Sequence, residues 1–114
     1  MGHRLIKKAE LEHTGYSVDF QGALFGATNL SFLLIDLPPG EGPRLHRHDY
    51  DEVIVILEGC GTYLVDGTMV RAETGDVLLI PAGTAHGFNN TGDVALKAID
   101  IHLNPQFATV WLED

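Results

Sequence analysis

The feature that most constrains the fold of this chain is a dense series of turn signals between short apolar runs. The 114 residues include 13 glycines, many of them beside Asp, Asn, Thr or Pro. Apolar runs such as 53–57 and 77–80 are short and are followed closely by such turns. Short runs of this kind are typical of β-strands, whereas helical periodicity is scarce. We therefore predict an all-β domain of about eight to ten strands, folded as a sandwich or barrel.

The turn residues divide the chain into expected elements. The expected strands cover residues 16–25, 28–37, 44–57, 62–65, 68–71, 77–80 and 94–103. The pair Asp66-Gly67 is the strongest hairpin signal in the chain. Pro38-Pro39-Gly40 ends the second strand, because proline has no N–H to donate to a ladder. Residues 5–12 form either a turn of helix or an arm.

Two of the expected strands, 53–57 and 77–80, are apolar on both faces. One face of each would fill the barrel interior. The other face needs cover, either from the N-terminal segment or from a second subunit. A homodimer is therefore an expectation, with the N-terminal arm contributing to its contacts.

The charge balance excludes two classes of partner. Seven basic and sixteen acidic residues give a formal net charge of −9. A nucleic-acid-binding protein needs a basic face to displace counterions from phosphates, and the sequence has no Lys/Arg cluster to form one. An anionic membrane surface is disfavoured for the same reason.

Targeting signals and cysteine pairing are also missing from the sequence. The basic residues near the start are not followed by an apolar segment, so no secretory signal is visible, and no run is long enough to span a membrane. Cys60 is the single cysteine and has no internal disulfide partner. We expect a cytoplasmic protein.

Histidines and a glutamate are spaced as metal ligands in the middle of the chain. His46, His48 and Glu52 share one parity of an extended stretch, so their side chains are expected on one face of a strand. His86 follows a Pro-Ala-Gly turn and is the best candidate for a fourth ligand from a neighbouring strand. Imidazole together with carboxylate suits first-row transition metals better than Ca²⁺ or Mg²⁺.

Two motifs around these residues resemble those of the cupin superfamily. The first is G-x5-H-x-H-x3–4-E-x6-G, and its fixed positions are Gly40, His46, His48, Glu52 and Gly59. The second is G-x5-P-x-G-x2-H-x3-N, and its fixed positions are Gly75, Pro81, Gly83, His86 and Asn90. The glycines, Pro81 and Asn90 are interpreted as turn residues.

The resemblance implies a double-stranded β-helix, or jelly-roll barrel. Residues 1–114 would form a single cupin domain, with 1–15 as an N-terminal arm or edge strand, 40–59 as motif one and 75–90 as motif two. It also implies that His46, His48, Glu52 and His86 bind one divalent transition metal ion. Fe, Mn, Ni, Zn, Cu and Co all tolerate this ligand set.

The other polar residues have less specific patterns. His3 and His13 are interpreted as surface residues. His102 faces either the barrel mouth or solvent, and Tyr50 either shares the ligand face or packs; these two are the candidates for additional catalytic groups. Arg44 lies either at the rim, where it could meet an anionic substrate, or in solvent.

Two functions remain open at this point. The first is a metal-dependent enzyme that acts on a small anionic or enolisable substrate, with dioxygenase-like chemistry slightly favoured over isomerase, decarboxylase or lyase chemistry. The second is a non-catalytic cupin module that binds or senses a small ligand. The resemblance allows both, since a fold does not select a reaction.

Overall fold

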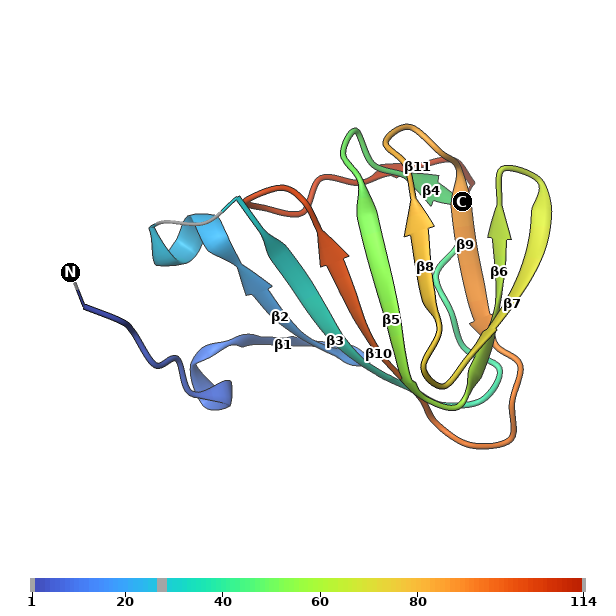
Figure 1. Ribbon diagram of the computed structural model, residues 1–114, viewed down its shortest axis with the longest axis horizontal. Coiled ribbons are helices and arrows are strands. Elements are labelled where there is room, and N and C mark those ends of the chain that lie inside the picture. Colours follow the sequence, from blue (N-terminus) through green and yellow to red (C-terminus); the bar gives the residue numbers. More distant parts are fainter. Residues whose placement is uncertain (1, 27–28, 114) are drawn as a thin grey trace.

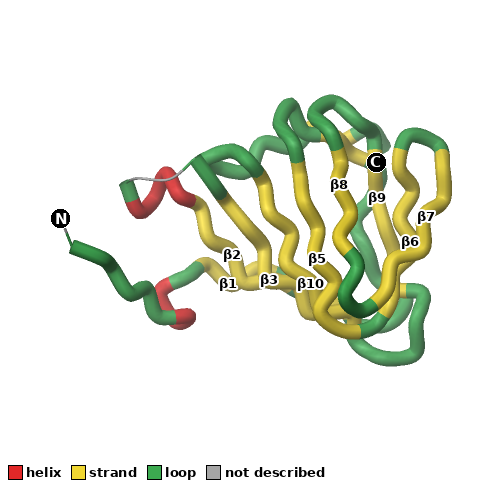
Figure 2. Tube along the Cα trace, in the orientation of Figure 1, coloured by secondary structure: helices red, strands yellow, loops and turns green. Residues whose placement is uncertain are grey.

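Two antiparallel sheets form the molecule, as the computed structural model shows (Figures 1 and 2). The structure describes residues 2–26 and 29–113. The six-stranded sheet has the order β1-β2-β3-β10-β5-β8, and the five-stranded sheet has the order β11-β4-β9-β6-β7. The fold class is therefore all-β, as the sequence predicts.

The strands of the six-stranded sheet are β1 (Glu12–Thr14), β2 (Ser17–Gln21), β3 (Ser31–Leu37), β10 (Leu96–His102), β5 (Glu52–Glu58) and β8 (Val77–Ile80). Those of the five-stranded sheet are β11 (Val110–Trp111), β4 (His46–Arg47), β9 (His86–Asn90), β6 (Cys60–Val65) and β7 (Thr68–Glu73). Two short 3₁₀ helices, η1 (Lys8–Glu10) and η2 (Gly22–Phe25), complete the secondary structure of the described residues.

The core lies between the two sheets. Alternate residues of β5 and β10 are buried, because successive side chains of a strand point to opposite faces. Ile54, Ile56 and Leu96 of the six-stranded sheet are in one apolar cluster with Tyr63 and Phe88 of the five-stranded sheet. The same alternation brings polar residues of both sheets into the interior at one end of the barrel.

The prediction of one continuous strand over 44–57 is wrong. The stretch divides into β4, in the five-stranded sheet, and β5, in the six-stranded sheet. Asp51 holds the crossing between the sheets: its carbonyl accepts a hydrogen bond from the N–H of Leu103, and its side chain accepts one from the N–H of Ala82. His46 and Glu52 therefore face each other from opposite sheets instead of lying along one strand.

The prediction of a strand over 16–25 is correct only at its start. The strand ends at Gln21, and η2 follows until Gly26, whose φ of +84° ends the helix. Residues 27 and 28 lie outside the described residues, and residue 28 is the expected start of the next strand. The N-terminal segment forms η1 and then β1, at the edge of the six-stranded sheet.

The hairpin at Asp66-Gly67 is confirmed. It joins β6 to β7, and both turn residues have positive φ, +49° for Asp66 and +77° for Gly67. Two central residues with positive φ match the right-handed twist of the strands. Among the described residues, no helix is long and apolar enough to cross a membrane.

Candidate metal centre

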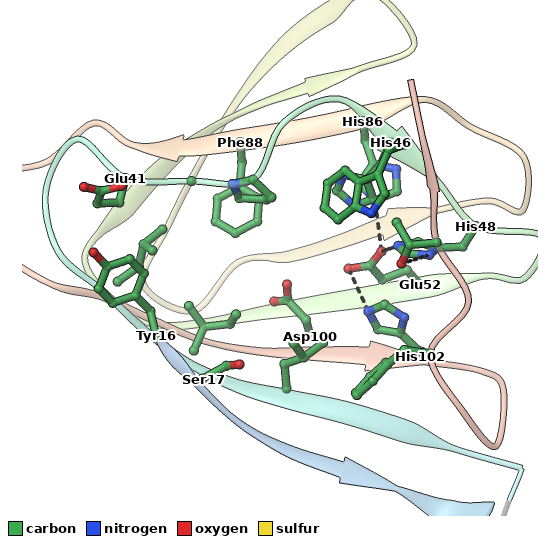
Figure 3. Close-up of a pocket in the computed structure, with 18 residues that line it drawn as sticks. Tyr16, Ser17, Glu41, His46, His48, Glu52, His86, Phe88, Asp100 and His102 are labelled. Carbon is green, nitrogen blue, oxygen red and sulfur yellow. Dashed lines mark hydrogen bonds and ion pairs between the residues drawn. The ribbon is translucent and has the colours of Figure 1, made fainter. Parts of the chain in front are cut away.

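The four residues of the two motifs meet inside the barrel. His46 is the first residue of β4 and pairs directly with His86, the first residue of β9. His48 follows β4, and Glu52 opens β5 on the opposite sheet. One potential ligand atom from each of the four lies within 4.8 Å of the others, and all four residues are buried (Figure 3). We call these four residues the His/Glu cluster.

Backbone carbonyl groups orient the three imidazoles of the cluster. The Nδ1 atom of His46 lies 2.7 Å from the carbonyl oxygen of Arg44, and that of His86 lies 2.8 Å from the carbonyl of Thr84. The Nδ1 atom of His48 lies 2.9 Å from the carbonyl of Ala108. A neutral imidazole that donates from Nδ1 has a free lone pair on Nε2, which is the arrangement that metal-ligating histidines use.

Glu52 lies against the Nε2 side of two of these rings. Its Oε1 atom is 3.0 Å from Nε2 of His86 and 3.3 Å from Nε2 of His48. Within the described part of the chain, Nε2 of His48 is buried without a hydrogen-bond partner of good geometry. A buried lone pair beside a carboxylate fits a divalent transition metal ion. Such an ion would accept electron pairs from the imidazole nitrogen and from the carboxylate oxygen.

The electrostatics of the cluster follow from burial and from the shared carboxylate. Burial alone would raise the pKa of Glu52, but the close approach of the His48 and His86 rings to its carboxylate outweighs burial and holds that pKa well below its ordinary value. Burial would lower the pKa of His86, and its hydrogen bonds to Glu52 and Thr84 reverse the shift and raise it. Burial lowers the pKa of His46. The Glu52 carboxyl group is therefore ionised at neutral pH.

The structure brings His102 to the cluster, where the sequence left its direction open. His102 is buried, and its Nε2 atom lies 3.6 Å from Oε2 of Glu52. Its Nδ1 atom is 2.7 Å from the hydroxyl of Tyr50. Tyr50 also accepts a hydrogen bond of 3.1 Å from the N–H of Ala108. Both residues named as additional candidates thus lie beside the cluster.

Sequence reasoning missed the C-terminal segment as part of the site. Ala108 contacts both His48 and Tyr50, and the ring of Trp111 lies 5.1 Å from that of His46. This segment follows the last expected strand and has no motif that points to the site. Arg44, left open between rim and solvent, is exposed and lies over the Trp111 ring at 5.2 Å. His13 is exposed, as interpreted from its sequence context.

A pocket of about 450 Å³ opens from the cluster along the barrel interior. The cluster and His102 lie at one end, and Tyr16, Ser17 and Glu41 lie at the other (Figure 3). Apolar side chains also line the pocket, among them Leu33, Ile35, Leu37 and Phe88. The pocket therefore has both apolar and polar side chains in its lining.

The fold and the site together define a small jelly-roll barrel with a buried three-histidine, one-glutamate cluster. The family model described as "Cupin domain" matches residues 33–102, which is more than half of the chain. This chain belongs to the cupin family.

The matches to curated relatives cover only part of this chain and only part of each relative. An oxalate-binding protein of Thermotoga maritima is 34% identical over 71 residues, which is 61% of this chain and 59% of that protein. An acireductone dioxygenase of Parvibaculum lavamentivorans is 37% identical over 65 residues, covering 54% of this chain and 35% of the dioxygenase. The chain thus spans less than two thirds of the length of these relatives.

Solved structures share the fold at lower identity. A point mutant of the oxalate decarboxylase from Bacillus subtilis has a TM-score of 0.80 and 23% identity, over 94% of this chain and 31% of that chain. The formate complex of Lactobacillus farciminis oxalate decarboxylase has a TM-score of 0.78 and 22% identity, over 91% of this chain and 34% of that chain. At this level of identity the likeness supports the barrel fold.

Proposed function

We propose that this chain is a metal-dependent cupin enzyme that acts on a small oxygen-rich substrate bound in the pocket. His46, His48, Glu52 and His86 would hold one divalent transition metal ion. The observation that carries the proposal is the convergence of four buried potential ligands, with each imidazole fixed through Nδ1. When bound, such an ion supplies Lewis-acid chemistry and, as Fe(II), chemistry with O₂.

Tyr50 and His102 would form a hydrogen-bonded pair that holds a proton on the His102 ring next to this centre. Burial raises the pKa of Tyr50, so its phenol stays protonated. Burial lowers the pKa of His102 to about 4, so its ring is neutral at neutral pH. In this arrangement the Tyr50 hydroxyl would donate to Nδ1 of His102, which would place the ring proton on Nε2, on the side of Glu52. His102 would thereby present an N–H donor to an oxygen of a bound substrate.

The positive charge of a divalent ion with one carboxylate ligand favours an anionic or enolisable substrate. Relatives with the names oxalate-binding protein, acireductone dioxygenase and gentisate 1,2-dioxygenase are consistent with small oxygen ligands of this kind. Dioxygenase chemistry is slightly favoured, since a His-rich site with a carboxylate suits O₂. A non-catalytic binding module is the second candidate, and the relative described as an oxalate-binding protein favours it.

Turnover separates the two candidates. Protein loaded with Fe(II) or Mn(II) is assayed for product formation and O₂ consumption with oxalate, a β-diketone, a catechol and gentisate. The enzyme proposal expects turnover of at least one compound, absent in Glu52→Gln, which is expected to lose the ion. Thermal stabilisation by a compound without turnover would instead favour the binding module.

We also propose that two copies associate through the outer face of the six-stranded sheet. Register places two cross-strand rows on that face, each with one residue from β2, β3, β10, β5 and β8. The rows are Phe20-Phe32-Ile101-Val53-Leu79 and Val18-Leu34-Ile99-Val55-Val77. Both rows are apolar throughout, and Leu79 and Val77 are 61% and 63% exposed. A contiguous apolar surface of this kind is typical of an interface.

A further inference from the structure

Asp100 is a buried carboxylic acid in the wall of the pocket. It lies on β10, where alternate residues face the interior, and it is 4% exposed. Figure 3 shows its carboxyl group pointing into the pocket, between the His/Glu cluster and the end formed by Tyr16, Ser17 and Glu41. Asp100 is therefore placed to contact a molecule that extends along the pocket.

The surroundings of Asp100 do not satisfy its carboxyl group. Its cross-strand neighbours are Leu33 on β3 and Ile54 on β5, both apolar. Within residues 2–26 and 29–113, its Oδ1 atom is buried without a hydrogen-bond partner. The hydroxyl of Tyr63, on β6 of the facing sheet, is also buried without a partner there. The barrel thus contains hydrogen-bonding capacity that its own described residues do not use.

An unpaired buried carboxyl group lowers stability, because its hydration is lost without compensation. A leucine has a similar size and would pack against Leu33 and Ile54 without this cost. Polar groups that break the packing rules of a core are typical of functional sites. The position of Asp100 in the pocket wall indicates that its partner is a bound ligand.

The charge state of Asp100 determines what it offers to that ligand. Burial, and then the negative charge of Glu52, raise the pKa of Asp100 well above its ordinary value. Among the described residues that line the pocket, none is Lys or Arg. An ion in the His/Glu cluster would offset the charge of Glu52 but not the burial of Asp100. A neutral carboxyl group donates its O–H to an oxygen acceptor.

We propose that Asp100 is a substrate-binding residue whose carboxyl group hydrogen-bonds a second oxygen of a substrate held at its other end by the metal centre. This inference rests on the proposed function. Leu33, the cross-strand neighbour of Asp100, and Phe88 line the pocket with apolar surface, which suits a short hydrocarbon segment between the two oxygen groups. The substrate class is a small acid with chelating oxygens at one end and a carboxylate or carbonyl oxygen at the other.

Two acids of equal length test the second contact. 2-Oxoglutarate and 2-oxopentanoate share the chelating 2-oxo acid head and differ in a terminal carboxylate or methyl group. Calorimetric titration of Mn(II)-loaded wild type is expected to give about tenfold or more tighter binding of 2-oxoglutarate, the value of a hydrogen bond to a charged group. Asp100→Leu should abolish this preference, and Asp100→Asn should retain it, since the amide still donates.

The control variant is His13→Ala, which removes an exposed side chain outside the pocket and should keep the preference. A preference that survives in Asp100→Leu would overturn the proposal, as would equal binding of both acids by the wild type. Failure of the proposed metal centre is distinguishable, because the wild type would then take up no Mn(II), and failure of the proposed catalysis would appear as binding of the acids without turnover of any tested compound.

Two measurements on the metal-free protein complete the test. Asp100→Leu should melt about 4 °C or more above the wild type, because it removes an unpaired buried polar group. The infrared spectrum of the wild type at neutral pH should contain a protonated-carboxyl band that Asp100→Asn lacks. A lower melting temperature of Asp100→Leu would assign Asp100 a structural role and contradict the proposal, and so would the absence of the infrared band.

Discussion

His86 is the residue whose removal tests the cluster most cleanly, because it alone comes from the second motif. We expect His86→Ala to lose most of the bound ion, since the remaining three ligands leave the site open on the β9 side. At a metal concentration one hundred times the Kd, the wild type gains about 2.7 kcal/mol from the ion, and this gain should disappear in the variant. Elemental analysis and thermal unfolding with and without Mn(II) measure both effects.

The matched control for this variant is His13→Ala, which removes an exposed imidazole far from the cluster in sequence. Its metal content and its stabilisation by Mn(II) should equal those of the wild type. Equal metal content in His86→Ala and His13→Ala would contradict the ligand assignment.

The raised pKa of Asp100 predicts that the stability of the metal-free protein depends on pH. Its folded pKa is raised, so the folded protein keeps a proton that the unfolded chain releases above about pH 4. Unfolding then releases a proton, and rising pH favours the unfolded chain by up to about 1.4 kcal/mol per pH unit until the folded pKa is reached. The asparagine in Asp100→Asn does not titrate.

The difference in unfolding free energy between Asp100→Asn and the wild type should therefore shift in favour of the variant between about pH 4.5 and pH 8. Denaturant unfolding of both proteins across this range measures it. A difference that is constant with pH, or one that shifts toward the wild type, would show that the Asp100 pKa is not raised.

The approach of the segment before β4 to β9 depends on Gly42. A Cβ atom added at Gly42 would lie 1.8 Å from the carbonyl oxygen of Phe88, and backbone on both sides of the contact leaves little room to yield. We expect Gly42→Ala to destabilise the protein by about 3 kcal/mol or more and to weaken metal binding, because β4 carries His46.

Gly40→Ala is the matched control for Gly42→Ala. No atom lies within 4 Å of its added Cβ, although its φ of +86° is unfavourable for alanine. Gly40→Ala should cost about 1 kcal/mol and leave the metal content unchanged. Equal losses of unfolding free energy in Gly42→Ala and Gly40→Ala would show that the close contact between residue 42 and Phe88 does not determine the stability.

At the scale of strands, local signals in the sequence were sufficient for the hairpins but not for the division between sheets. Asp66-Gly67 encodes its turn in two residues, so β6 and β7 were predictable. The break between β4 and β5 was not predictable from the sequence. The alternation of residues along a strand indicates which face a side chain is on, but not which sheet the strand joins. His102 illustrates the same limit: its parity was correct, but its proximity to Glu52 depends on the pairing of β10 with β5.

At the scale of the whole molecule, the outer face of the six-stranded sheet exposes apolar side chains of β8. The two apolar rows on the outer face of the six-stranded sheet predict a homodimer, with a mass of twice the 12.4 kDa of the chain in solution. Leu79→Glu should produce a monomer, because it places a charge within the apolar contact that the two copies would bury. Light scattering coupled to size exclusion measures the mass.

Met69→Glu is the control, since Met69 is 66% exposed on β7 of the other sheet. It should remain a dimer. A wild type that is monomeric at all concentrations, or a dimer that persists in Leu79→Glu, would contradict this interface.

The central claim is that the His/Glu cluster binds one divalent metal ion. A crystal of protein loaded with Mn(II), measured at a wavelength where manganese scatters anomalously, tests it most directly. We predict one strong anomalous peak per chain, within bonding distance of Nε2 of His46, His48 and His86 and of the carboxylate of Glu52. The absence of a peak there, or a peak bound by other side chains, would contradict the account.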